Sequence, residues 1–97
     1  MSLKEKINED MKSAMRSKDV ALLGTIRLIL AAIKQKEVDE RILVDDSSVI
    51  SIIEKMLKQR NDSIEAFKKA NRTDLVDKEE FEVSVLKNYM PEQINAE

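Results

Sequence analysis

The 97 residues of this chain are enough for one domain, and a hydrophobic content of 42% provides a core, which excludes a disordered chain. One Gly and one Pro leave too few turn residues for an all-β protein or for a glycine-rich phosphate loop. The absence of Cys and His excludes disulfides, thiolate chemistry and every His-dependent catalytic arrangement. We therefore expect no catalytic residue, no metal site and no cofactor, and favour a chain that is not an enzyme by itself. The less favoured alternative is an enzyme whose acid–base groups would be carboxylates, Lys or Tyr89.

The net charge is −2. The N-terminus carries no apolar signal segment, and no apolar run is long enough to span a bilayer. This pattern predicts a soluble cytoplasmic protein, with neither a membrane nor DNA as a partner.

The spacing of apolar residues predicts an all-α, four-helix bundle-like domain over residues 1–93. Its helices are expected at about 2–17, 19–38, 47–70 and 73–90. The first begins at a capping box formed by Ser2 and Glu5, and Asp19 can cap the second.

The helix expected at 19–38 is the most apolar and should be the central one. Besides its main stripe it has a second side, where small residues permit the close approach of another helix. That second side contains Gly24, Leu28 and Ala31. The acid-rich connection that follows is interrupted by Ile42, Leu43 and Val44, which we expect to pin it onto the bundle.

The two remaining helices each carry a charge within an apolar face. Arg60 lies in the middle of the apolar arc of helix 47–70, and Glu79 in that of helix 73–90, for which Thr73 is a suitable N-cap and Pro91 a stop. A lone buried charge is costly, so each residue needs a partner. We predict an Arg60–Glu79 ion pair between these helices, with a structural role favoured over ligand binding.

Two surfaces are candidates for binding. Exposed cations gather toward the end of helix 47–70, and the candidate RNA-binding residues are Lys58, Lys68, Lys69 and Arg72. Without interleaved aromatic residues, such a surface would contact the RNA backbone and not individual bases. A solvated face that complements the helix dipole is the alternative interpretation. Helix 73–90 also carries a separate ridge, a candidate for contact with a partner or a further domain, formed by Phe81, Val85 and Tyr89.

Several segments together resemble YqeY-like proteins of the GatB/YqeY family, in order and over nearly the whole chain. These segments are Thr25–Leu28, Ala31–Lys34, Lys58–Phe67, Ala70–Val76 and Leu86–Gln93. The resemblance implies a helical N-terminal domain followed by a smaller helical domain. Residues 94–97 would then begin a connection to a second domain that is absent from this chain.

The resemblance also suggests a function. A similar module forms the tail of the GatB subunit of the glutamine-dependent aspartyl/glutamyl-tRNA amidotransferase, where it contacts tRNA while other domains perform the chemistry. The family is grouped with carbon–nitrogen ligases that use glutamine as amido donor by similarity alone, and its motifs supply no catalytic residue for this chain. We therefore expect a non-catalytic module that binds tRNA or a tRNA-handling protein. The alternative is a protein–protein interaction module that docks through the ridge of helix 73–90.

Overall fold

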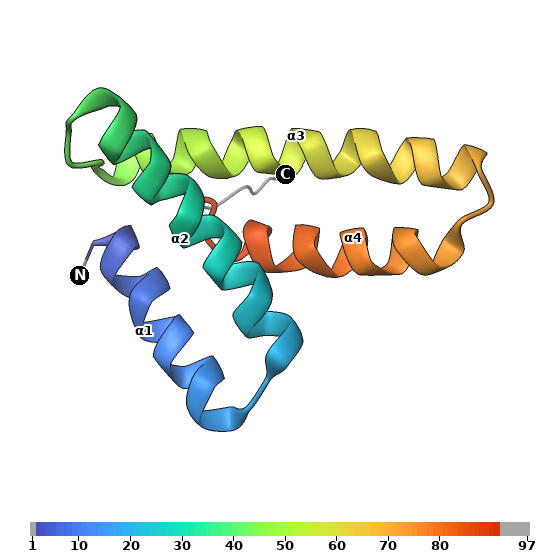
Figure 1. Cartoon of the computed structure of the whole chain (residues 1–97), viewed down its shortest axis with the longest axis horizontal. Helices are drawn as coiled ribbons and strands as arrows, with labels where there is room; N and C mark the ends of the chain where they lie inside the picture. Colours follow the sequence, from blue (N-terminus) through green and yellow to red (C-terminus); the bar gives the residue numbers. More distant parts are fainter. Residues whose placement is uncertain (1, 92–97) are drawn as a thin grey trace. The chain divides into compact units, whose positions relative to one another are not determined.

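The computed structural model describes residues 2–91, which form four α-helices and no strand (Figure 1). The helices are α1 (Leu3–Ser17), α2 (Val20–Glu40), α3 (Asp46–Lys69) and α4 (Thr73–Lys87). The all-α class is thus confirmed, with each predicted helix present. None of the helices in this described range is long and apolar enough to cross a membrane. The connection expected at residues 94–97 lies outside the described residues.

The chain divides into two compact units, Met1–Ile52 and Ile53–Glu97, with the boundary inside α3. The apolar spacing gave no sign of this division within the predicted domain 1–93, because the helical pattern of α3 runs through the boundary without a break. Each unit is described separately below.

In the first unit, α1 and α2 lie side by side as an antiparallel hairpin (Figure 1). The predicted caps are present: Ser2 and Glu5 form a reciprocal capping box, and the Asp19 carboxylate accepts a hydrogen bond from the backbone N–H of Leu22. The hairpin turns at Lys18, whose backbone is left-handed with φ of 60° and whose N–H closes the end of α1. The caps at Ser2 and Asp19, both readable in the sequence, fix where α1 and α2 begin.

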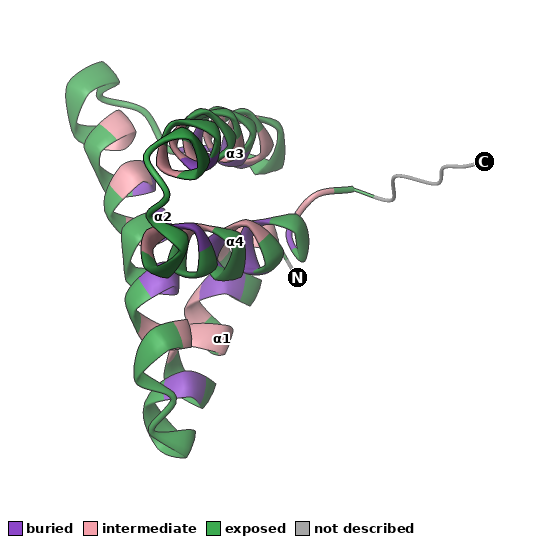
Figure 2. Cartoon of the chain, turned by 90° about the vertical axis from the view of Figure 1, so that its right-hand side faces the viewer, coloured by how far each residue is buried: buried purple, intermediate pink, exposed green. Residues whose placement is uncertain are grey.

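α2 contributes more buried residues to the first unit than α1 does, which agrees with the prediction that it is the central helix. Its buried residues are Thr25, Ile26, Ile29 and Ile33. The second apolar side of α2 is exposed instead of covered (Figure 2). There the exposed fraction of Leu28 is 44%, and a Cβ added at Gly24 would meet no atom within 4 Å.

The connection between α2 and α3 is held by one apolar side chain, not three. Val44 is buried, whereas Ile42 is 41% exposed and Leu43 is 86% exposed. The prediction that all three residues pin this connection is therefore wrong for Ile42 and Leu43.

In the second unit, the part of α3 from Ile53 onward and α4 run antiparallel (Figure 1). The turn between them passes through Asn71, whose φ is 59°. The predicted cap at Thr73 is wrong, because α4 begins at Thr73 itself and the capping position is held by Arg72, without a side-chain cap bond. At its other end α4 stops at Lys87, three residues before the predicted end, and continues as a tighter turn.

That turn has a simple geometry. The backbone N–H groups of Asn88, Tyr89 and Met90 each donate to the carbonyl three residues earlier, at 3.1–3.2 Å. This narrower winding is common where a helix ends. Pro91, which cannot continue the hydrogen-bond ladder, follows directly.

Candidate functional surfaces and the contacts that position them

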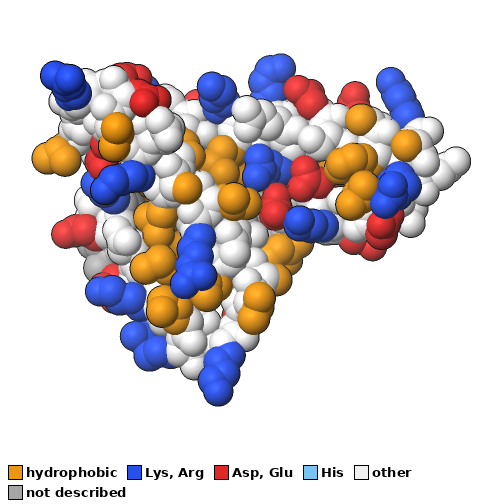
Figure 3. All heavy atoms as spheres, viewed as in Figure 1, with side chains coloured by type: hydrophobic (Ala, Val, Ile, Leu, Met, Phe, Trp, Pro, Cys, Tyr) orange, Lys and Arg blue, Asp and Glu red, His pale blue; other side chains and the backbone are white. Residues whose placement is uncertain are grey.

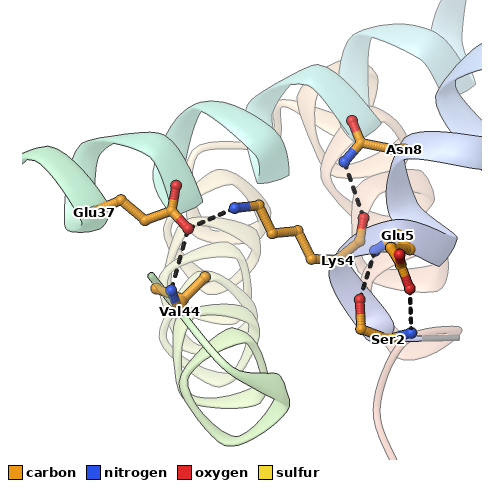
Figure 4. Close-up of polar contacts among 6 residues, drawn as sticks. All are labelled: Ser2, Lys4, Glu5, Asn8, Glu37 and Val44. Carbon is orange, nitrogen blue, oxygen red and sulfur yellow. Dashed lines mark hydrogen bonds and ion pairs between the residues drawn. The ribbon is translucent and has the colours of Figure 1, made fainter. Parts of the chain in front are cut away.

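A polar cluster joins the start of α1 to the end of α2 (Figure 4). The Lys4 ammonium lies 2.6 Å from Glu37 Oε2, and the backbone N–H of Val44 donates to the same oxygen at 3.1 Å. These two hydrogen bonds hold the pKa of Glu37 below its ordinary value of 4.5. Nearby, the backbone N–H of Leu3 donates to Asp46 Oδ1 at 2.9 Å, which satisfies one of the free N–H groups at the start of α1.

This cluster is structural, because each of these polar groups bonds to another part of the same unit. Sequence reasoning missed it, since Lys4 and Glu37 are separated by 33 residues. One signal could have found the pair: in an antiparallel hairpin that turns at Lys18 and Asp19, Lys4 lies opposite α2 within about one turn of Glu37. A long Lys side chain spans that remaining distance.

The second unit contains an ion pair between α3 and α4 that differs from the predicted pair in one residue. The Arg60 guanidinium Nε donates to Glu82 Oε1 at 3.1 Å, so its direct partner is Glu82 and not Glu79. The side chains of Arg60 and Glu82 are only 18% and 9% exposed. Glu79 lies beside this pair, and its pKa is raised by burial, by the charge of Glu82 and by a hydrogen bond with that carboxyl, while Arg60 partly offsets these effects.

The physical reason for the exchange of partners is a wider buried face on α4. Val85 and Tyr89 are buried, at 4% and 6% exposure, where the sequence analysis had assigned them to a separate ridge. When these residues join the buried face, its centre moves around the helix from Glu79 toward Glu82. Phe81, the third member of that ridge, is 40% exposed. The ridge thus presents only one of its three side chains at the surface.

The four candidate RNA-binding cations are all exposed but are not equally available. The Arg72 guanidinium makes two hydrogen bonds to the Asp74 carboxylate, at 3.3 and 3.2 Å. Lys58 lies 3.9 Å from Asp62 across one turn of α3. Lys68 and Lys69, in the last turn of α3, make no ion pair with any described residue. These two lysines are therefore the freest positive charges of the four.

Three features of the chain are thus available for function: the two lysines at the end of α3, the exposed Phe81, and the exposed side of α2. Figure 3 shows hydrophobic side chains over α2, with Lys and Arg side chains among them. The buried Arg60–Glu82 pair and the Lys4–Glu37 pair position helices and do not form an open site.

Comparison with known proteins gives matches over nearly the whole chain. A family model described as Yqey-like protein matches residues 4–97. The protein named altered inheritance of mitochondria protein 41, mitochondrial, from Lachancea thermotolerans is 42% identical over 85 residues, covering 87% of this chain and 46% of the relative. The protein of the same name from Pyrenophora tritici-repentis is 40% identical over 87 residues, covering 90% and 48%. An uncharacterized protein of Schizosaccharomyces pombe is 34% identical over 90 residues, covering 93% and 70%.

Two consequences follow. The chain spans about half the length of the mitochondrial relatives that it matches. The prediction of a cytoplasmic location is contradicted, because these relatives are named as mitochondrial proteins. The predicted location rested on composition and on the lack of a long apolar run, and neither observation distinguishes the cytoplasm from an organelle.

Proposed function

The chain belongs to the YqeY-like family, and on that premise we propose that it is a non-catalytic binding module that associates with tRNA. The observation that carries this proposal is the presence of two adjacent cations, Lys68 and Lys69, exposed and without an acidic partner among the described residues. The sequence also resembles the amidotransferase tail, which contacts tRNA without performing the chemistry.

The charges on α3 determine how such binding would work. Unpaired lysines gain most from a phosphate, because they give up only water and counterions to bind it. Arg72 and Lys58 would first have to leave Asp74 and Asp62. Since the described part of this surface has no row of aromatic side chains, contact would be with phosphates and backbone shape, with little preference for base sequence.

The test measures the binding of fluorescently labelled unfractionated tRNA by the chain at low salt, with a salt titration. We expect Lys68→Gln/Lys69→Gln to weaken binding about tenfold and to reduce the slope of log K against log salt by about one to two. Arg72→Gln and Lys58→Gln should have smaller effects. The matched control is Lys6→Gln/Lys12→Gln on α1, which removes the same charge from lysines already paired with Asp10 and Glu9.

Equal losses in the α3 and α1 variants would mean that only net charge matters and would refute the assignment of the surface. The absence of tRNA binding by the unmodified chain at low salt would refute the proposal itself.

A docking role in protein–protein interaction is the second proposal, and it rests on the 40% exposure of Phe81. Phe81→Ser should then abolish recovery of a defined protein partner after nuclease treatment, without loss of helical content. Val85→Ser and Tyr89→Ser are not suitable tests, because both side chains are buried and their loss would destabilise the unit. If nuclease treatment removes every co-purifying protein, tRNA association is favoured over docking.

A further inference from the structure

The exposed side of α2 carries a regular apolar stripe. Within the described residues, six of the seven exposed large hydrophobic side chains lie between positions 15 and 43, around α2. Three of these six belong to one line of exposed residues along the helix. That line is Val20, Ala21, Gly24, Leu28, Ala31, Gln35 and Val38. From Ala21 onward its members are separated alternately by three and four residues, which is the repeat of helices that pair with another helix.

This stripe faces away from the core of its own unit. The buried residues Ile26, Ile29 and Ile33 lie on the opposite side of the helix, as the 100° step per residue requires. In Figure 2 the exposed positions of α2 lie on one side of the ribbon and the buried positions on the other. The stripe is therefore accessible to a helix from outside the unit without disturbing the hairpin with α1.

Gly24 gives a second, independent indication. It is the only glycine of the sequence, lies inside α2 and has no positive φ, so its backbone conformation does not require glycine. A Cβ placed there would meet no atom within 4 Å, so packing within the first unit does not require glycine either. Glycine in a helix interior lowers helix stability. A close approach by a helix from outside the first unit is a physical use that remains for this residue.

The charges along the stripe indicate which helix it accepts. One edge is basic, with Arg27 and Lys34. Neither forms an ion pair with a described residue, although the charge of Lys34 contributes to the lowered pKa of Glu37. The other edge carries Asp39. If two copies of α2 pair in parallel, the seven-residue repeat places Lys34 of one copy beside Asp39 of the other, on both sides of the pair. Antiparallel pairing would instead place Lys34 against Arg27, which is repulsive.

We propose that the exposed stripe of α2 is a self-association surface, on which a second copy of this chain docks with its α2 parallel to the first. Leu28 of each copy would then pack against Leu28 of the other, and Gly24 against Gly24. The small residues allow the two backbones to approach, while Lys34 and Asp39 select the parallel direction.

Crosslinking of single-cysteine variants tests the geometry, since the natural sequence contains no cysteine. Leu28→Cys should form a disulfide-linked dimer under mild oxidation, because position 28 meets its own copy within disulfide reach only in a parallel pair. Ser51→Cys, which introduces an exposed thiol on α3, is the matched control and should not crosslink. Crosslinking between Leu28→Cys and Ala31→Cys chains in a mixture, without Leu28→Cys homodimers, would indicate antiparallel pairing and would overturn the proposal.

Sedimentation of the unmodified chain over a range of concentrations tests whether the pair forms. We expect a monomer–dimer equilibrium that Ala31→Glu weakens at least about tenfold, since two carboxylates would face each other across the interface. Ala31 is exposed, so the thermal unfolding of the monomer should be unchanged, and Ser13→Glu on α1 serves as the charge-matched control. Lys34→Asp and Asp39→Lys should each weaken the dimer, and the double variant should restore it. A monomer at every concentration would overturn the proposal.

Discussion

Removal of the Arg60 guanidinium should destabilise the second unit more than removal of its partner carboxylate. The Arg60→Met substitution keeps most of the aliphatic volume but removes the charge that lies 3.1 Å from Glu82. Exposed ion pairs contribute about 0–1 kcal/mol, whereas breaking a fully buried pair costs about 3–5 kcal/mol. Exposed fractions of 18% and 9% place this pair between the two limits. We therefore expect a loss of about 2 kcal/mol in the free energy of unfolding at neutral pH.

The asymmetry comes from Glu79, which already has a raised pKa beside Glu82. Without Arg60, the carboxyl groups of Glu79 and Glu82 remain beside each other and lose its positive charge, whereas Glu82→Gln leaves Arg60 with Glu79 still close by. The assay is urea unfolding followed by circular dichroism for both single variants and the double variant Arg60→Met/Glu82→Gln. The coupling energy should be about 1–2 kcal/mol. A coupling below about 0.3 kcal/mol, or a larger loss in Glu82→Gln than in Arg60→Met, would refute this reasoning.

Three further predictions concern stability. Because the pKa of Glu79 is raised in the folded state, ionisation of Glu79 opposes folding as pH rises above the ordinary pKa of 4.5. Glu79→Gln should therefore be more stable than the natural chain at pH 7, and the difference should vanish in acid. The pKa of Glu37 is lowered by Lys4 and by the N–H of Val44, so its stabilisation is present above pH 4.5 and is lost as pH falls through the lowered pKa. Glu37→Gln should accordingly be less stable than the natural chain at pH 7 and equal to it in acid. Thermal melts of both variants at several pH values measure these differences in stability. Differences of the same sign for the two variants at pH 7 would contradict the assigned causes. Finally, Lys18→Gly should raise the free energy of unfolding by about 0.5–1 kcal/mol, because only glycine adopts a left-handed backbone without steric cost; an unchanged melting temperature would show that Lys18 is not strained.

The sequence was sufficient to predict the local features of the fold but not the partners of charges across helices. Caps at Ser2 and Asp19 involve residues three apart, so the helix starts could be predicted from neighbours in the sequence. The partner of Arg60 depends on how far α4 is rotated about its axis, and that rotation is set by the burial of Val85 and Tyr89, which helical spacing alone does not determine. The spacing likewise could not reveal the boundary between the two units, because the boundary lies inside a continuous helix.

For the candidate RNA-binding residues, too, one property was predictable from the sequence and another was not. Their exposure was predictable from the spacing of α3, since cations opposite an apolar face remain in water. Which cations are free was not predictable, because the distinction between Lys68 and Arg72 depends on the Arg72 side chain reaching Asp74 across the start of α4. The structure therefore reduces four equivalent candidates to an ordered set, with Lys68 and Lys69 first.

The distribution of glycine in the chain links stability to the proposed self-association. Among the described residues, three left-handed positions lack glycine: Lys18 and Arg41 carry a steric cost there, whereas Asn71 is a residue type that tolerates this conformation. The one glycine lies instead inside α2, where no backbone angle and no neighbouring atom requires it. A sequence adapted only to the stability of the single chain would have the opposite arrangement, with glycine at the helix ends and alanine at position 24. The position of Gly24 is therefore better explained by a neighbour outside the first unit than by the packing of the hairpin, which agrees with the self-association proposed for the stripe of α2.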